Sequence, residues 1–228
     1  MNHLVFNKKI YNFDIIFDKT GALFIKDNKT LVLADLHLGK SISLNRTGNF
    51  VPLYDNEETI KSLKNIIFKY NPLKIITLGD SFHDKFSILN MNKQHLSELK
   101  KITQNFNFIW IIGNHDKNLL GTEKISGTFL DNFSKENLRF THIKTNGKSS
   151  ETFEFSGHYH PKTYLKINNS RYYYKCFVIG KNFCILPSFG YYTGGIDIRS
   201  EIFKEIKNEY IELVVLGKRK IIHQKFKL

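Results

Sequence analysis

The sequence predicts an α/β fold in which two β-sheets pack face to face, with helices on the outside. Short apolar runs alternate with amphipathic segments in the first half of the chain, which indicates strands joined by helices. Strand-like runs predominate in the second half. Polar side chains that can bind metal ions follow several of these runs, so the strand ends of both halves are expected to meet at one rim.

The first predicted strand is followed by a helix. Residues 31–34 form a continuous apolar run that ends at Asp35, the pattern of a strand buried on both faces. A helix is expected from Asp55, because Glu58 three residues later completes a capping box, and Pro72 ends it. Its apolar stripe consists of Ile60, Leu63, Ile66 and Ile67.

Two further strands and a second helix continue the alternation. Residues 73–80 predict a buried strand that delivers Asp80, and residues 108–112 predict one that delivers Asn114. Residues 93–106 between them predict a helix. Its apolar stripe consists of Leu96, Leu99, Ile102 and Phe106. Right-handed crossovers would make the three strands parallel, so their carboxyl ends would share one edge.

The second half of the chain supplies three histidines, His142, His158 and His160. Strands are expected over residues 138–145, 152–158, 172–179, 182–188 and 209–216, with a helix from Arg199 to Ile206.

Two segments of this half have alternative interpretations. We expect the rings of Tyr172, Tyr173 and Tyr174 to alternate along a strand and pack on the core, in preference to stacking on nucleic acid bases. The basic tail over residues 216–228 predicts a solvated edge hairpin at least as strongly as a nucleic-acid contact.

Length and composition predict one domain spanning residues 1–228. With 228 residues, of which 41% are hydrophobic, the chain can bury a large core. The longest apolar run, residues 108–112, is too short to cross a bilayer, and the N-terminus lacks the pattern of a secretory signal. Cys176 and Cys184 are too few for a disulfide framework, so we expect free thiols in a cytoplasmic protein.

The net charge of +13 is compatible with a nucleic-acid partner, because basic surfaces attract phosphate backbones. Lysine greatly outnumbers arginine, however, and an AT-rich genome would produce the same bias without selection for binding. Charge alone therefore leaves a nucleic-acid partner and a merely solvated surface equally open.

Seven side chains form a mixed oxygen and nitrogen donor set, and they occur in clusters after apolar runs. They are Asp35, His37, Asp80, Asn114, His142, His158 and His160. Such a set is large enough to hold two divalent ions that share one carboxylate. It predicts metal-assisted hydrolysis of a phosphate ester.

Each cluster is weak evidence alone. Gly-Asp and Gly-Asn pairs also occur in ordinary turns, and a single histidine is more often a core or surface residue. The D-x-H and H-x-H pairs place both side chains on the same side, since residues two apart in a strand project together. The motif "GNHD" is better evidence, because His115 and Asp116 add a base and an orienting carboxylate. All the clusters in this order make coincidence a poor explanation.

The clusters resemble those of a known family, the calcineurin-like metallophosphoesterases. The motifs D-x-H, G-D, G-N-H-[DE], a lone His and G-H-x-H occur in that order from Asp35 to His160. The chain is most similar to the bacterial ligase-associated DNA damage response endonucleases, the PdeM branch. This closer resemblance extends to Gly195 and rests on "ADLHLGK", "LGDSFHD", "GNHD", "GHYHP", "CFV" and "LPSFGYYTGG". One departure is that "IKT" follows His142, where the family usually has Glu-Pro.

The resemblance implies a four-layer αββα sandwich of two mixed sheets with outer helices. It also implies two metal sites that share the bridging carboxylate of Asp80. One site would consist of Asp35, His37, Asp80 and His160, and the other of Asp80, Asn114, His142 and His158. A hydroxide held between the ions would attack phosphorus in line with the leaving oxygen.

Three further residues receive roles by the same resemblance. His115 would be the general acid that protonates the leaving oxygen, since imidazole titrates near neutral pH. Asp116 would orient the His115 imidazole. His83, within "GDSFH", would contact the phosphate or the leaving group, or else have a structural role behind the ligands.

The donor set contains no thiolate, which leaves manganese, iron, zinc or, less well, magnesium. The resemblance implies two Mn²⁺ ions. It also implies an endonuclease acting on single-stranded DNA in bacterial DNA repair, in association with a DNA ligase and a helicase.

Two alternative functions remain. The first is a small-molecule phosphodiesterase or phosphomonoesterase, which would use the same metal centre. The second is a catalytically silent nucleic-acid-binding protein, and the intact Asp80, Asn114 and His115 argue against it.

Overall fold

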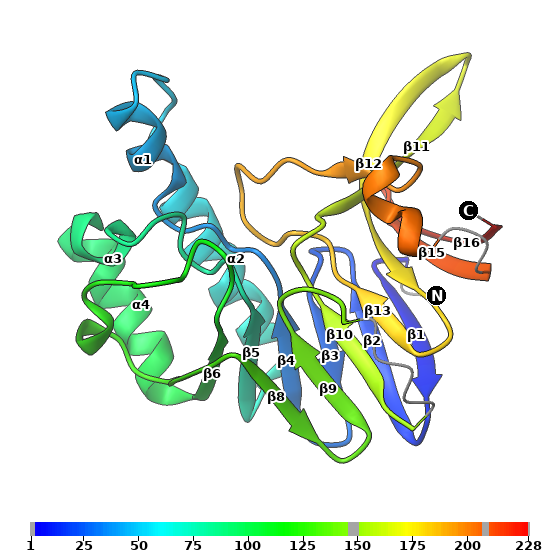
Figure 1. The fold of residues 1–228 in the computed structure, drawn as a ribbon, viewed down its shortest axis with the longest axis horizontal. Helices are drawn as coiled ribbons and strands as arrows, with labels where there is room; N and C mark the ends of the chain where they lie inside the picture. The colour runs from blue at the N-terminus through cyan, green and yellow to red at the C-terminus, as the bar shows by residue number, and fades with distance from the viewer. Residues whose placement is uncertain (1–2, 146–150, 207–209, 228) are drawn as a thin grey trace.

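The computed structural model describes residues 3–145, 151–206 and 210–227, and it contains two mixed β-sheets (Figure 1). The first sheet has the strand order β1-β2-β3-β4-β5-β6-β7. Its strands are β1 (Val5–Ile10), β2 (Phe13–Asp18), β3 (Leu23–Ile25), β4 (Thr30–Leu33), β5 (Lys74–Leu78), β6 (Asn107–Ile111) and β7 (Thr128–Leu130). Strands β1 to β4 are antiparallel, and β4 to β7 are parallel.

The second sheet has the order β14-β11-β12-β13-β10-β9-β8, and β15 joins β12 to β16 beside this path. Its strands are β8 (Asn132–Lys135), β9 (Leu138–Thr141), β10 (Phe153–Ser156), β11 (Pro161–Ile167), β12 (Ser170–Ile179), β13 (Phe183–Ile185), β14 (Ile196–Asp197), β15 (Tyr210–Leu216) and β16 (Ile221–Lys227). The predicted strands of the second half are all present. The basic tail forms an edge hairpin from β15 and β16, as expected.

Helices α2 (Asp55–Tyr70) and α4 (Lys93–Asn105) make the crossovers β4–α2–β5 and β5–α4–β6. They confirm the predicted alternation of strands and helices. The remaining helices are short: α1 (Lys40–Arg46), α3 (Ser87–Asn90), the 3₁₀ turn η1 (Thr122–Lys124) and the 3₁₀ helix η2 (Glu201–Ile206). The helix predicted from Arg199 to Ile206 is the 3₁₀ segment η2, which is kinked at Phe203.

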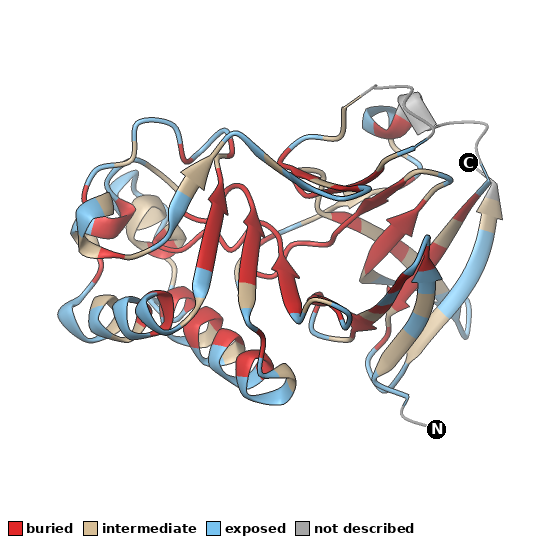
Figure 2. Ribbon diagram, turned by 90° about the horizontal axis from the view of Figure 1, so that it is seen from below, coloured by how far each residue is buried: buried red, intermediate tan, exposed pale blue. Residues whose placement is uncertain are grey.

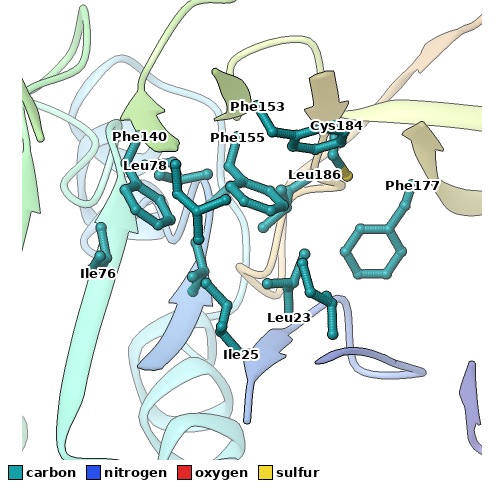
Figure 3. Packing of buried hydrophobic residues seen from close by; sticks show 14 of the residues in the cluster. Leu23, Ile25, Ile76, Leu78, Phe140, Phe153, Phe155, Phe177, Cys184 and Leu186 are labelled. Atoms are coloured by element: carbon teal, nitrogen blue, oxygen red, sulfur yellow. The ribbon is translucent and has the colours of Figure 1, made fainter. Parts of the chain in front are cut away.

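The two sheets pack on one another through a shared apolar core. Phe17 of β2 and Phe177 of β12 meet edge to face, with ring centroids 5.1 Å apart. Figure 3 shows Leu23 and Ile25 of the first sheet facing the same space as Phe155 of the second. Because both inner faces are apolar, the sheets are fixed relative to each other, and so are the loops at their rims.

The outer face of the first sheet is covered by α2 and α4. Leu63, Leu99 and Trp110 are almost completely buried between helices and sheet. The central strands β4, β5 and β6 are almost entirely buried, whereas the helices expose one side to solvent (Figure 2). This one-sided burial is what the apolar stripes of both helices predict.

One helix-start prediction was wrong. Helix α2 does begin at Asp55, but the preceding Tyr54 is the cap residue, and no side chain caps the helix. The Asp55 carboxylate instead accepts hydrogen bonds from the backbone N–H and the hydroxyl of Ser41. Asn56 likewise accepts a hydrogen bond from the backbone N–H of Gly39 at 2.7 Å. The start of α2 therefore fixes the chain that follows His37.

The prediction for the tyrosine run was also wrong. The side chains of Tyr172 and Tyr173 are 49% and 51% exposed, and only Tyr174 packs against buried residues. These tyrosines lie on the part of β12 that projects beyond the sheet (Figure 1).

Both cysteines are buried and free, and burial raises the pKa of each thiol. Within the part of the chain that the structure describes, none of the helices has the length and apolar character needed to span a membrane.

Candidate metal centre

The predicted ligands lie where strands of both sheets end. Asp35 and His37 follow β4, Asp80 follows β5, and Asn114 follows β6 in the first sheet. In the second sheet, His142 follows β9, and His158 and His160 follow β10. Because the sheets pack on each other, these ends meet at one rim, as the sequence predicts.

One group of donors consists of Asp35, His37 and His160. Their donor atoms all lie within 4.8 Å of one another. The Nε2 atom of His160 is 3.3 Å from Oδ1 of Asp35 and 3.4 Å from Nε2 of His37. Two imidazole nitrogens directed at one carboxylate are a typical metal-binding arrangement.

A second group consists of Asp80, His142 and His158, again with donor atoms within 4.8 Å of one another. The Nε2 atom of His142 is 3.4 Å from Oδ2 of Asp80 and 3.1 Å from Nδ1 of His158. The same Oδ2 atom of Asp80 is 4.0 Å from Nε2 of His37. A single carboxylate oxygen therefore lies between the two groups.

Asn114 is placed at the edge of this arrangement. It is exposed, and it lines an open pocket of about 260 Å³ together with His142, Lys117 and Arg139. The structure thus brings six of the seven predicted ligands into two compact groups and puts the seventh beside them.

The tautomers and charge states of these groups suit a divalent metal. His142 donates its Nδ1–H to the Leu78 carbonyl at 2.8 Å, so the Nε2 atom of His142 is the ring nitrogen that faces Asp80. Burial lowers the pKa of His37 to about 2, and the charges of the neighbouring imidazoles and Lys40 act in the same direction. The negative charge of Asp80 raises this pKa but is outweighed. The Nδ1 atom of His37 is buried and has no hydrogen-bond partner in the structure. Imidazole nitrogens and carboxylate oxygens, without thiolates, are donors that fit Mn, Fe or Zn.

The remaining pKa shifts have local causes. Burial would raise the pKa of Asp80, but the hydrogen bond and charge of His142 outweigh it and lower this pKa. Burial would lower the pKa of His142, but Asp80 and Asp35 outweigh it and raise this pKa. Burial and the adjacent His142 lower the pKa of His158.

Five of the predicted ligands have a left-handed backbone. Their φ angles lie between 43° and 71°; the residues are Asp35, His37, Asp80, His158 and His160. Such a conformation costs a non-glycine residue about 1–3 kcal/mol and is concentrated at functional sites. The surrounding packing therefore holds these side chains in positions that an isolated loop would leave.

The residues predicted to assist catalysis lie beside the two groups. The Nδ1 atom of His115 is 2.7 Å from the backbone carbonyl of His83, so Nδ1–H donates and Nε2 stays available. The rings of His83 and His115 stack with centroids 5.1 Å apart. His37, His83 and His115 also have donor atoms within 4.8 Å of one another.

The predicted contact from Asp116 to the His115 imidazole is not found, and the carbonyl of His83 orients that ring. The Asp116 carboxylate accepts hydrogen bonds from the backbone N–H groups of Gly113 (3.0 Å), Ser81 (3.2 Å) and Phe82 (3.0 Å). Burial outweighs these bonds and raises the pKa of Asp116 to about 6. Asp116 therefore ties the loop after β5 to the loop after β6.

Two lysines at the site were missed from the sequence. Lys40 lies close enough for its charge to lower the pKa of both His37 and His83. Its position three residues after His37 was the available signal.

The second missed lysine, Lys175, is partly buried. It donates to the carbonyls of Ser188 (2.7 Å) and Gly190 (3.2 Å), and burial lowers its pKa to about 8. The N–H of Gly190 in turn donates to the backbone carbonyl of Asp35. Nothing in the strand pattern distinguishes Lys175 from a solvated lysine.

The loop between β13 and β14 approaches the site, since the backbone N–H of Gly190 donates to the carbonyl of Asp35. A Cβ atom on Gly195 would lie 2.5 Å from the backbone oxygen of His160, so only glycine fits there. A Cβ atom on Gly194, in contrast, would meet nothing within 4 Å.

The fold and the donor groups are those of a known protein family. The model of the calcineurin-like phosphoesterases matches residues 29–215. The chain belongs to the calcineurin-like phosphoesterase family. The match spans every predicted ligand and all strands of both sheets from β4 to β14.

Among solved structures, the chain is similar to Pseudomonas putida nuclease MPE, with a TM-score of 0.77 and 20% sequence identity. That match covers 96% of this chain and 100% of the nuclease. The chain also matches the E. coli phosphoesterase Yfce, with a TM-score of 0.40, 12% identity and coverage of 86% and 97%. None of the curated proteins matches the chain. The similarity to nuclease MPE confirms the predicted fold of two packed mixed sheets.

We expect Gly113→Ala to weaken metal binding. A Cβ atom on Gly113 would lie 2.2 Å from the backbone N and 2.3 Å from Oδ1 of Asp80, so the Asp80 carboxylate must move. Displaced supporting groups typically reduce metal affinity about 10–100-fold. Calorimetric titration of chelator-treated protein with Mn²⁺ measures the change. Gly194→Ala is the control because its Cβ atom meets nothing, and equal affinities of the two variants would contradict the prediction.

Proposed function

We propose that the chain is a metal-dependent phosphodiesterase that cleaves single-stranded DNA internally. The observation that carries the proposal is the position of Oδ2 of Asp80, at 3.4 Å from Nε2 of His142 and 4.0 Å from Nε2 of His37. One oxygen between two donor groups is what a pair of cations sharing a carboxylate requires.

The two donor groups indicate which residues would hold each metal ion. Asp35, His37, Asp80 and His160 would hold one; Asp80, Asn114, His142 and His158 would hold the other. Mn²⁺ is the proposed metal, because the donors exclude a thiolate site and the family resemblance favours manganese. When bound, the two ions would supply positive charge at the phosphoryl oxygens and a water acidified to act near neutral pH.

The chain's own residues would orient the substrate and deliver a proton. His115 holds its Nδ1–H on the His83 carbonyl, so a protonated His115 can release a proton only from Nε2, toward the leaving oxygen. The stacked His83 ring limits the rotation of His115. Lys40 adds a positive charge beside His37 and His83, which favours an anionic phosphodiester.

DNA is the proposed substrate for three reasons. The net charge is +13, the fold is that of nuclease MPE, and the sequence resembles the ligase-associated endonucleases. We place the activity in the cytoplasmic DNA repair of a bacterium, alongside a DNA ligase and a helicase, on the strength of that resemblance.

Circular single-stranded DNA tests the proposal because it has no ends. With Mn²⁺, the wild-type chain should convert circles to linear strands, and Asp80→Asn should slow this at least ~100-fold, since it weakens both ion sites at once. Asp14→Asn, an exposed carboxylate on β2, should leave the rate unchanged. Hydrolysis of aryl phosphates without nicking would instead support a small-molecule phosphoesterase. DNA binding without turnover of any phosphoester would support a silent binding protein.

A leaving-group comparison tests the role of His115. His115→Asn should slow DNA cleavage about 10²–10⁴-fold, because an alkoxide leaves poorly without a proton. The same variant should hydrolyse bis(p-nitrophenyl) phosphate at a rate much closer to wild type, because p-nitrophenolate leaves without protonation. Equal losses on both substrates would show that His115 acts elsewhere than on the leaving oxygen.

A further inference from the structure

We propose that one face of the hairpin formed by β11 and β12, called here the arm, binds the nucleic acid strand beside the metal centre. The arm comprises residues 161–179. This inference rests on the proposed function, since it names the surface that holds the substrate.

The arm projects from the body of the protein (Figure 1). In β12, only residues 176–179 pair with β13 and β15, whereas residues 170–175 pair with β11 alone. In β11, only Pro161 and Lys162 pair with β14. Beyond this base the hairpin is two-stranded. One of its faces packs in part against the body of the protein, since Leu165 and Tyr174 contact the buried cluster around Cys176 and the hydroxyl of Thr163 accepts a hydrogen bond from Arg199. On the other face, Tyr173 is 51% exposed.

The two faces of the arm differ in chemistry. Strand register pairs Lys162 with Lys175, Tyr164 with Tyr173, and Lys166 with Arg171. Because side chains alternate between faces, these six residues share one face, which we call the cationic face. It carries every cation of residues 161–179, and this segment contains no Asp or Glu. The opposite face carries Thr163, Leu165, Ile167, Tyr172 and Tyr174.

Cations and rings interleave on the cationic face. The guanidinium of Arg171 lies 4.8 Å from the ring centroid of Tyr164, and the ammonium of Lys162 lies 5.3 Å from that of Tyr173. The two tyrosine rings meet at 5.8 Å and 68°.

Like charges directly opposite each other destabilise a strand pair. The cationic face has such a pair in Lys166 and Arg171. A phosphate group bound beside this pair would relieve the repulsion, and a nucleic acid backbone carries such groups at regular intervals.

The cationic face begins at the metal centre. Pro161 directly follows His160. At the other side of the base, Lys175 donates to the carbonyl of Gly190, whose N–H donates to the carbonyl of Asp35. Tyr173 and Arg171 lie about 7 and 14 Å further along the same strand face. A strand held in the metal centre could therefore continue along the arm.

The exposed rings indicate a single strand as the ligand. Tyr173 is 51% exposed, and an exposed ring can stack on a base only where the base face is free. A duplex hides its base faces, so it would gain only the charge interactions.

The test compares neighbouring tyrosines on opposite faces. Binding of a labelled oligothymidylate of about 16 nucleotides is measured by fluorescence anisotropy with EDTA present, which prevents cleavage. Tyr173→Ala should weaken binding about tenfold, the loss of one stacked base. Tyr172→Ala, which removes an equally exposed ring from the other face, should change affinity less than about twofold. Equal losses, or no loss in either variant, would overturn the proposal, as would a loss confined to duplex DNA.

Salt dependence tests the charges separately. Arg171→Gln should reduce the slope of log K against log salt by about 0.7, the contribution of one phosphate contact to a single strand. Arg219→Gln, exposed in the turn between β15 and β16, should leave that slope unchanged. An unchanged slope for Arg171→Gln would contradict the phosphate contact.

The arm and the proposed function can fail independently. Tyr173→Ala and Arg171→Gln should hydrolyse bis(p-nitrophenyl) phosphate at the wild-type rate, because this substrate is too small to reach from the metal centre to the arm. If the wild-type protein does not nick circular DNA but oligothymidylate binding still depends on Tyr173, the proposal for the arm is supported and the nuclease proposal is contradicted. If the wild-type protein nicks circular DNA but all variants bind oligothymidylate equally, the nuclease proposal is supported and the proposal for the arm is contradicted.

Discussion

The carboxylate of Asp80 is the group on which the arrangement of the centre depends. Its Oδ1 atom accepts the backbone N–H of His115 at 2.9 Å, while Oδ2 faces His142 and His37. Because His142 follows a strand of the second sheet, this one side chain links the rims of both sheets. The apolar core between the sheets keeps that link in register, so packing far from the site determines donor geometry within it.

The left-handed backbone of five predicted ligands follows from the same constraint. Asp35 is completely buried, and both of its oxygens accept the backbone N–H of His158, at 3.1 and 3.0 Å. Strain at Asp35 and His158 is therefore offset by hydrogen bonds and by sheet packing, rather than by anything in the loops themselves. A centre built this way has its donors in place before a cation arrives, which limits the reorganisation needed on binding.

The sequence predicted the parts of the structure that follow from local pattern. Apolar runs located β4, β5 and β6, and the polar residues just beyond them proved to lie at a common rim. The failures concern tertiary neighbours. Asp55 had every local feature of a helix cap, yet its carboxylate accepts hydrogen bonds from Ser41 of helix α1. Asp116 is adjacent in sequence to His115, but the His115 ring donates its hydrogen bond to the carbonyl of His83 instead. Alternation alone could not show that the strand carrying Tyr173 extends beyond the sheet, where Tyr173 is 51% exposed.

Crystals of the protein grown with Mn²⁺ and measured at the manganese absorption edge test the central claim most directly, since anomalous scattering locates each ion. The account predicts two peaks, one on each side of the Asp80 carboxylate, with His37 and His160 near one and His142 and His158 near the other. A single peak, no peak, or peaks away from Asp80 would contradict it.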